Sequence, residues 1–68
     1  MQEIKVRDEF IKLGQALKAS NLVSSGVEAK LVIQDGQVEV NGEVDTRRRR
    51  KLVPGDMITF DGKSVKIV

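Results

Sequence analysis

The spacing of the apolar residues changes along this chain, and the change limits the folds that it can adopt. In the first half, apolar residues return every three or four positions, which is typical of one face of an amphipathic helix. The first such set is Phe10, Leu13, Gly14 and Leu17. We therefore predict a helix from about Asp8, with Asp8 and Glu9 in its first turn, where carboxylates favour the positive end of the helix dipole.

A second helix is predicted to begin after Ser25, because the four residues from Ser25 to Glu28 have the pattern of a capping box. In that arrangement the Ser25 hydroxyl accepts a hydrogen bond from the Glu28 amide, and the Glu28 carboxylate reaches back to Ser25. The buried stripe of this helix is Ala29, Val32 and Ile33. Gly36 is expected to end the helix in the left-handed conformation.

Beyond Gly36 the apolar residues alternate with polar ones, as they do along a half-buried strand. Turn sequences separate the expected strands: Asn41-Gly42, Pro54-Gly55-Asp56 and Asp61-Gly62. We place strands around 38–40, 44, 57–60 and 64–68, and a short opening strand at 2–6. The predicted fold class is therefore α+β, with two packed helices against a small, mostly antiparallel sheet in a single domain spanning residues 1–68.

The composition excludes most kinds of catalytic site. The 68 residues include no His, Cys or Tyr, so the usual proton carriers and activated nucleophiles are missing. No phosphate-binding glycine pattern is present either, and we predict a protein that is not an enzyme and holds no metal or cofactor. No apolar run approaches the roughly 18–20 residues that cross a bilayer. We expect a monomeric, cytoplasmic protein.

The charges are unevenly distributed, although the net charge of the chain is only +2. Residues 1–46 carry five basic and eight acidic side chains, whereas residues 47–68 carry seven basic and two acidic ones. The excess is concentrated in one basic run: Arg47, Arg48, Arg49, Arg50 and Lys51. Guanidinium groups donate paired hydrogen bonds to phosphates, so the run indicates a polyanionic partner. A solvated, mutually repelling loop and a nuclear-localisation signal are the alternative interpretations.

Phe10 and Phe60 are the aromatic residues of the chain, and both are predicted to lie in the core because they occur within apolar patterns. Proteins that bind single-stranded nucleic acids stack the bases on exposed aromatic side chains. The lack of such residues favours a folded RNA that is recognised by its shape and phosphates. Lys12, Lys18 and Lys30 are weaker candidates individually, because exposed lysines are common on helices.

Several stretches of the chain together form a known pattern. They are Lys12-Leu13 with Leu17, Ser25-Gly26-Val27-Glu28-Ala29-Lys30, Gly36 to Gly42, and Lys51-Leu52-Val53-Pro54-Gly55-Asp56. This pattern, spread over about residues 12–60, resembles the RNA-binding domain first seen in small-subunit ribosomal protein four. The Ser-Gly-x-x-Ala-Lys start and the arginine-rich loop resemble most its stand-alone bacterial form, the YbcJ-like or YaaA-like family.

This resemblance implies an alpha-L RNA-binding motif that binds structured RNA without catalysis. The RNA is commonly ribosomal or transfer RNA, and the ribosome itself is among the implied partners. The residues that align with the RNA-facing positions of the family are Lys12, Ser25, Lys30 and Lys51. Gln15 and Gly26 depart from the pattern, since the wider family often has a basic residue at the first position and arginine at the second. We expect Arg47, Arg48, Arg49 and Arg50 to compensate, which shifts the centre of the contact toward the loop.

Two other functions stay open at this point. A basic patch also suits an adaptor that binds an acidic protein surface, and nuclease-sensitive co-purification separates that function from RNA binding. Ubiquitin-like sulfur carriers have a similar length and opening strand, but they need a Gly-Gly end, whereas this chain ends in Lys66-Ile67-Val68. No membrane partner is expected, because neither predicted helix combines a basic face with exposed bulky apolar residues.

Overall fold

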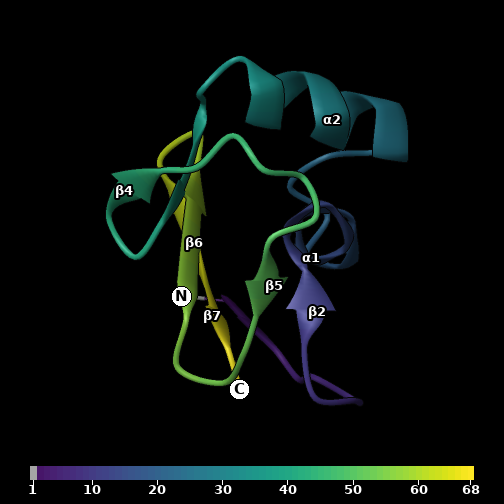
Figure 1. Cartoon of the computed structure of the whole chain (residues 1–68), viewed down its shortest axis with the longest axis vertical. Coiled ribbons are helices and arrows are strands. Elements are labelled where there is room, and N and C mark those ends of the chain that lie inside the picture. The colour runs from purple at the N-terminus through teal and green to yellow at the C-terminus, as the bar shows by residue number, and fades with distance from the viewer. Residues whose placement is uncertain (1) are drawn as a thin grey trace.

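The computed structural model describes residues 2–68, and Figure 1 shows the order of their helices and strands. The helices are α1 (Leu13–Ala19) and α2 (Gly26–Gln34). The strands are β1 (Gln2–Ile4), β2 (Ile11–Lys12), β3 (Val38–Val40), β4 (Glu43–Val44), β5 (Lys51–Leu52), β6 (Met57–Phe60) and β7 (Lys63–Ile67). No helix within this described range is long and apolar enough to cross a membrane.

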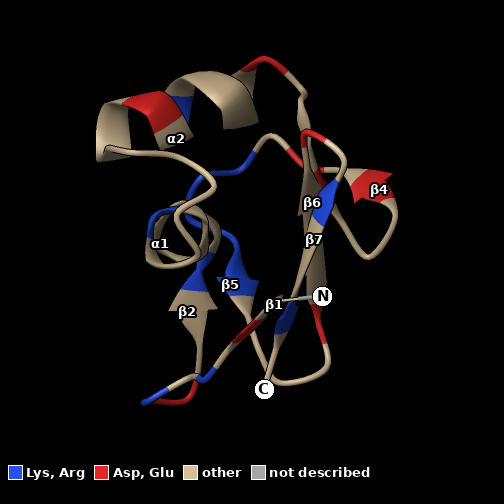
Figure 2. Ribbon diagram, turned by 180° about the vertical axis from the view of Figure 1, so that it is seen from behind, with Lys and Arg blue, Asp and Glu red and all other residues tan. Residues whose placement is uncertain are grey.

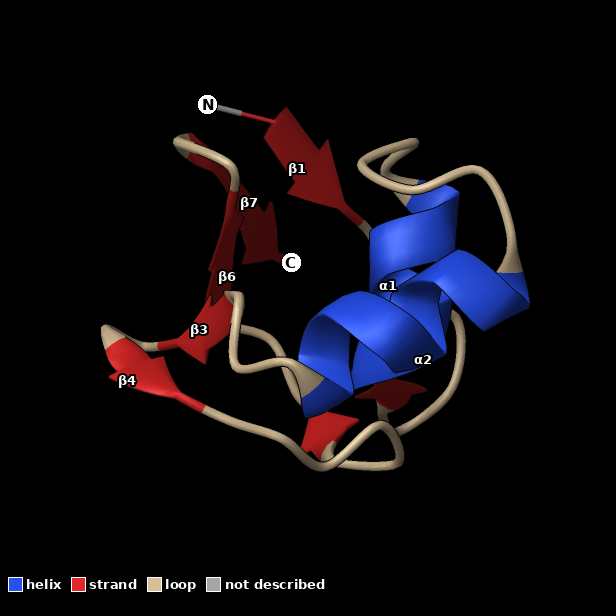
Figure 3. Cartoon of the chain, turned by 90° about the horizontal axis from the view of Figure 1, so that it is seen from above, coloured by secondary structure: helices blue, strands red, loops and turns tan. Residues whose placement is uncertain are grey.

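The main sheet has the strand order β1-β7-β6-β3-β4. Its strand pairs are antiparallel except for β1 with β7, which run parallel and place Ile4 opposite Ile67. A parallel pair requires a long connection, and here that connection contains both helices. Figure 3 shows the helices packed together on one side of this sheet. The predicted α+β class, with a mostly antiparallel sheet, is confirmed.

The core lies between the two helices and the sheet. Its fully buried side chains include Leu13, Leu17, Ile33, Leu52, Ile58, Val65 and Ile67. Alternation along β7 explains the last two, because Lys66 between them faces solvent. The predicted stripe of α2 is confirmed, since Ala29 and Ile33 are buried and Val32 packs against them. Ile4 and Val6 also pack against this core, and so does Phe60, as predicted.

The predicted two-residue turns are confirmed by their backbone angles. Asn41 and Gly42 have φ values of 54° and 86°, and Asp61 and Gly62 have 54° and 75°. Two successive positive φ values fit the tight hairpin turn whose twist matches that of the flanking strands, and Asn, Asp and Gly tolerate them best. Gly36, with φ of 76°, follows α2 as predicted. These turns fix the register that pairs β3 with β4 and β6 with β7.

The first turn of α2 is capped by Ser25, but one arm of the predicted capping box is wrong. The Glu28 amide donates a hydrogen bond to Ser25 Oγ at 3.1 Å, as expected. Glu28 Oε1, however, accepts from the Ser24 amide at 2.7 Å and from Ser24 Oγ at 2.9 Å. Ser24 thus offers both its amide and its hydroxyl as donors to one carboxylate oxygen. These bonds also hold the pKa of Glu28 below its usual value.

The predicted start of the first helix near Asp8 is wrong, because α1 begins at Leu13. The residues just before it form β2, which pairs with β5 so that Ile11 lies opposite Leu52 and Lys12 opposite Lys51. Asp8 and Glu9 therefore lie outside the helix, and its first turn holds no acidic residue. Long-range strand pairing has replaced an extra turn of helix, which local spacing alone did not predict.

Phe10 precedes β2, and its predicted place in the core is also wrong. The side chain is half-buried and lies outside the core cluster of the described residues. Lys51 Nζ sits 4.9 Å from the centroid of its ring, within the range of a cation–π contact. Pairing of β2 with β5 brings these two residues together, so the phenyl ring supports a cation at the surface.

Candidate nucleic-acid interface

An open groove of about 560 Å³ lies between α1, the first turns of α2 and the loop before β5. We call it the interhelical groove. Its charged lining residues are all cations: Lys12, Lys18, Lys30, Arg48 and Arg49. The smaller or apolar residues that line it include Gly14, Gly26, Val27 and Ala29. A concave surface lined by charges of one sign concentrates ligands of the opposite sign, so this groove is suited to an anion.

Backbone hydrogen bonds attach the loop with the four arginines, Arg47–Arg50, to the start of α1. The Leu13 amide donates to the Arg50 carbonyl at 2.9 Å, and the Gly14 amide donates to the Arg48 carbonyl at 3.0 Å. These amides belong to the first residues of α1, which have no partner within the helix. Carbonyl groups of the arginine loop therefore accept hydrogen bonds from the free amides at the start of α1. These bonds fix the loop despite the repulsion among its guanidinium groups.

Gly14 allows this close approach of loop and helix. A Cβ atom at position 14 would lie 3.0 Å from Arg48 Cγ and 3.6 Å from the Arg48 carbonyl oxygen. The first of these distances is tighter than ordinary van der Waals contact, so a larger residue would require the Arg48 side chain to shift. The apolar spacing predicts Gly14 only as part of a helix face, and nothing in that spacing indicates this close contact with Arg48.

Asp45 is a second residue that sequence reasoning missed. It is one of the few buried polar residues in the described range, with 6% of its surface exposed. Its carboxylate accepts hydrogen bonds from Arg47 Nε, Arg47 Nη2 and Arg50 Nη1 at 3.1, 2.9 and 2.7 Å. The bonds from Arg47, followed by those from Arg50, hold the pKa of Asp45 well below its usual value. The signal in the sequence is an acidic residue two positions before the basic run.

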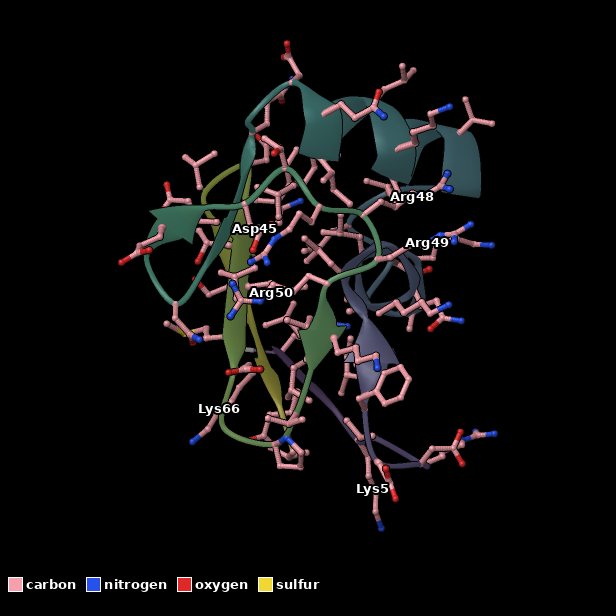
Figure 4. The ribbon with its side chains drawn as sticks, viewed as in Figure 1. Lys5, Asp45, Arg48, Arg49, Arg50 and Lys66 are labelled. Atoms are coloured by element: carbon pink, nitrogen blue, oxygen red, sulfur yellow. The ribbon has the colours of Figure 1, made fainter. Side chains whose placement is uncertain are left out.

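Asp45 divides the arginine loop into two halves. Figure 4 shows Arg50 beside Asp45 on the sheet side of the loop, whereas Arg48 and Arg49 extend on the side of the helices. No ion pair is formed by Arg48 or Arg49 within the described residues, and both are exposed. The two central arginines therefore have no acidic partner among the described residues, while the outer two share one carboxylate.

Five of the eight predicted site residues line the interhelical groove: Lys12, Ser25, Lys30, Arg48 and Arg49. A shallower depression on the outer side of the loop is lined by Arg47, Arg49, Arg50 and Lys51. Because Arg49 belongs to both, the predicted residues form one continuous basic surface. Lys18, which was only a weaker candidate in the sequence, also lines the groove and lies one helical turn after Gly14.

The basic surface formed by the predicted residues lies on the side of the helices and the arginine loop. In Figure 2, Lys and Arg of α1, β2, β5 and the arginine loop lie near one another, further Lys and Arg lie on β7 and in the loop before β2, and β4 carries an acidic residue. The separation explains how a chain with a net charge of only +2 can present a strongly positive region. It also orients an approaching polyanion toward the helices.

Comparison with known proteins identifies the family. The model of the S4 domain matches residues 4–68. This chain belongs to the S4 domain family. The resemblance noted in the sequence is thereby confirmed. Among its relatives is YbcJ of Escherichia coli strain K12, which is provisionally named an RNA-binding protein. The two chains are 43% identical over 58 residues, which cover 85% of this S4 domain and 83% of YbcJ.

A second relative is RlbA of Bacillus subtilis strain 168, provisionally named a ribosome maturation protein. It is 42% identical over 59 residues, or 87% of this chain and 83% of RlbA. The fold agrees with the solution structure of E. coli YbcJ, which is described as having an αL motif involved in RNA binding. That comparison gives a TM-score of 0.77 and 38% identity, and it covers 100% of this S4 domain and 87% of the solved chain.

Proposed function

We propose that this S4 domain binds structured RNA without catalysing a reaction. The RNA is ribosomal RNA, free or within the ribosome, or transfer RNA. The observation that carries the proposal is the interhelical groove, whose five charged lining residues are all cations. The names of YbcJ and RlbA, which refer to RNA binding and to ribosome maturation, point in the same direction. The protein acts as a cytoplasmic monomer in this proposal.

The contact residues in this proposal are Lys12, Ser25, Lys30, Arg47, Arg48, Arg49, Arg50 and Lys51. Arg48 and Arg49 are the centre of the contact, because they line the groove and form no ion pair within residues 2–68. Arg47 and Arg50 contribute less to phosphate binding, because Asp45 already accepts their hydrogen bonds. In this proposal the arginine loop compensates for Gln15 and Gly26.

Binding rather than catalysis is supported by the groove lining, which contains hydroxyl, amide and cationic groups but no carboxylate. A lysine without a carboxylate or imidazole neighbour has no partner for proton transfer. Phosphate contacts of this kind position an RNA and supply affinity, whereas base contacts supply sequence preference. The protein is therefore expected to recognise the shape of an RNA first.

The test is crosslinking in cells followed by sequencing of the attached RNA. The wild type is compared with a variant that carries Arg48→Gln and Arg49→Gln, and with a control that carries Lys5→Gln and Lys66→Gln. The control removes the same charge from exposed lysines far from the arginine loop (Figure 4).

Enrichment of a ribosomal or transfer RNA segment by the wild type and by the control, but not by the arginine variant, is the expected result. Equal enrichment by all three proteins would refute the proposed contact centre. The adaptor function would instead be favoured if no RNA were enriched above background and an acidic protein still co-purified after nuclease treatment.

A further inference from the structure

The interhelical groove has an apolar wall that phosphate binding does not require. Val27 lines the groove and keeps 69% of its surface exposed, although it is apolar. Ala29 and the glycines at positions 14 and 26 complete this part of the lining. A site for phosphates alone gains nothing from an exposed valine, so the groove suits a ligand with both an anionic and an apolar part.

Gly26 leaves space in the groove, although neither the backbone conformation nor the packing at this position requires a glycine. It is the first residue of α2, its φ is not in the left-handed region, and a Cβ built there meets no atom within 4 Å. Glycine is also a poor helix former. Gly14 differs, since a Cβ at that position would lie 3.0 Å from Arg48 Cγ. The fold therefore explains Gly14 but not Gly26, whose missing side chain only leaves space in the groove.

A nucleotide combines the two chemistries that this groove presents. Its base is flat and largely apolar on its faces, and its phosphates are anionic. The groove volume of about 560 Å³ lies within the range of about 300–1,000 Å³ that is typical of sites for small organic ligands. No aromatic ring lines the groove, but Arg48 and Arg49 supply planar guanidinium groups, on which RNA bases also stack.

We propose that the interhelical groove receives one unpaired nucleotide of a folded RNA. The base lies against Gly26 and Val27 and stacks on the guanidinium group of Arg48 or Arg49. The flanking phosphates bind Lys12, Lys18 and Lys30. This inference rests on the proposed RNA-binding function and narrows its ligand from folded RNA in general to folded RNA with a bulged or looped-out base, which is the form in which RNA bases become accessible to proteins.

The test uses synthetic RNA hairpins and the variant Gly26→Leu, which fills the groove and keeps every charge. One hairpin is fully paired, and four others carry a single bulged A, C, G or U. The matched control is Gln34→Leu, which adds the same side chain at an exposed position of α2 that does not line the groove. Fluorescence anisotropy gives the affinities, and thermal unfolding checks that both variants fold.

The wild type and Gln34→Leu are expected to bind at least one bulged hairpin about tenfold more tightly than the paired hairpin. Gly26→Leu is expected to lose that preference while its affinity for the paired hairpin and its salt dependence stay unchanged. Equal affinity of the wild type for all five RNAs, or a preference that survives in Gly26→Leu, would overturn this inference and leave RNA binding standing. Failure of the wild type to bind any hairpin would overturn both proposals.

Discussion

Asp45 binds Arg47 through two parallel hydrogen bonds, from Nε to Oδ1 at 3.1 Å and from Nη2 to Oδ2 at 2.9 Å. The Arg47 amide adds a third at 2.9 Å to Oδ1. The side chain of Asp45 is almost fully buried, with 5% exposed, whereas that of Arg47 is 70% exposed. The pair therefore anchors the beginning of the arginine loop to the body of the protein, and Arg50 anchors its end on the same carboxylate.

Replacing Asp45 by Asn should destabilise the protein, because it removes the negative charge that two guanidinium groups share. Hydrogen bonds to charged groups contribute about 1.5–3 kcal/mol each when well formed, and Asn retains part of the geometry. We expect a loss of about 1–3 kcal/mol, a large part of the roughly 3–5 kcal/mol available to a domain of this size. Urea denaturation at pH 7 measures the change. Unfolding midpoints that coincide for the variant and the wild type would show that the pair adds no stability.

Acid should weaken the protein through the same residue. The pKa of Asp45 is lowered in the folded state from the ordinary value of 3.8. Its contribution is therefore complete above that value and is lost as the pH falls toward the folded pKa, since the unfolded chain takes up the proton first. Asp56, whose pKa is lowered by bonds from the Val53 amide and from Asn41, adds to the effect.

Urea midpoints from pH 7 to pH 2 test this dependence. The stability difference between the wild type and Asp45→Asn should be constant from pH 7 to about pH 5 and should shrink below pH 4. Asp8→Asn, which removes a carboxylate from an exposed loop, serves as the control. A difference that stays the same down to pH 2 would contradict the assignment of the acid sensitivity to Asp45.

Arg47 and Arg48 are adjacent and have the same charge, but their replacement should have different effects. Arg48→Gln should reduce RNA affinity and lower the slope of log affinity against log salt concentration by about 0.9, which is the value for one phosphate contact. Arg47→Gln should change that slope less and should lower the midpoint of urea unfolding, because Arg47 is bonded to Asp45.

Salt titration by fluorescence anisotropy measures these slopes. If about four phosphates are neutralised, the affinity of the wild type should fall on the order of 100-fold between ~50 and ~200 mM salt. A nearly flat response would argue against phosphate contacts altogether. Identical slopes for the two arginine variants would show that Asp45 does not divide the loop.

The glycines near the starts of α1 and α2 should respond in opposite ways to alanine. Gly26→Ala should raise stability by about 0.4–1 kcal/mol, because the new methyl group meets no neighbour and the unfolded chain loses freedom. Gly14→Ala should give no such gain and should weaken RNA binding several-fold, because its methyl group displaces Arg48. Urea unfolding and anisotropy on both variants measure these effects, and a stabilised Gly14→Ala with unchanged affinity would contradict them.

Local features of the sequence predicted most elements well. The α2 helix was found from its serine cap, its apolar spacing and Gly36, and the hairpin turns from Asn41-Gly42 and Asp61-Gly62. Each depends on residues that are neighbours in the chain. The start of α1 was placed wrongly because Ile11 and Lys12 pair with β5, far along the chain. That pairing leaves no trace in the local spacing of apolar residues.

The sequence by itself determined the sign and the amount of charge, the family pattern and the residue types of the candidate site. Tertiary structure alone decided which of those charges act together. Backbone bonds from Leu13 and Gly14 to the arginine loop bring Arg48 and Arg49 to the groove, and Asp45 holds Arg47 and Arg50 away from it. Four identical side chains in a row are equivalent in a sequence, and only the different partners that the fold gives them make them different.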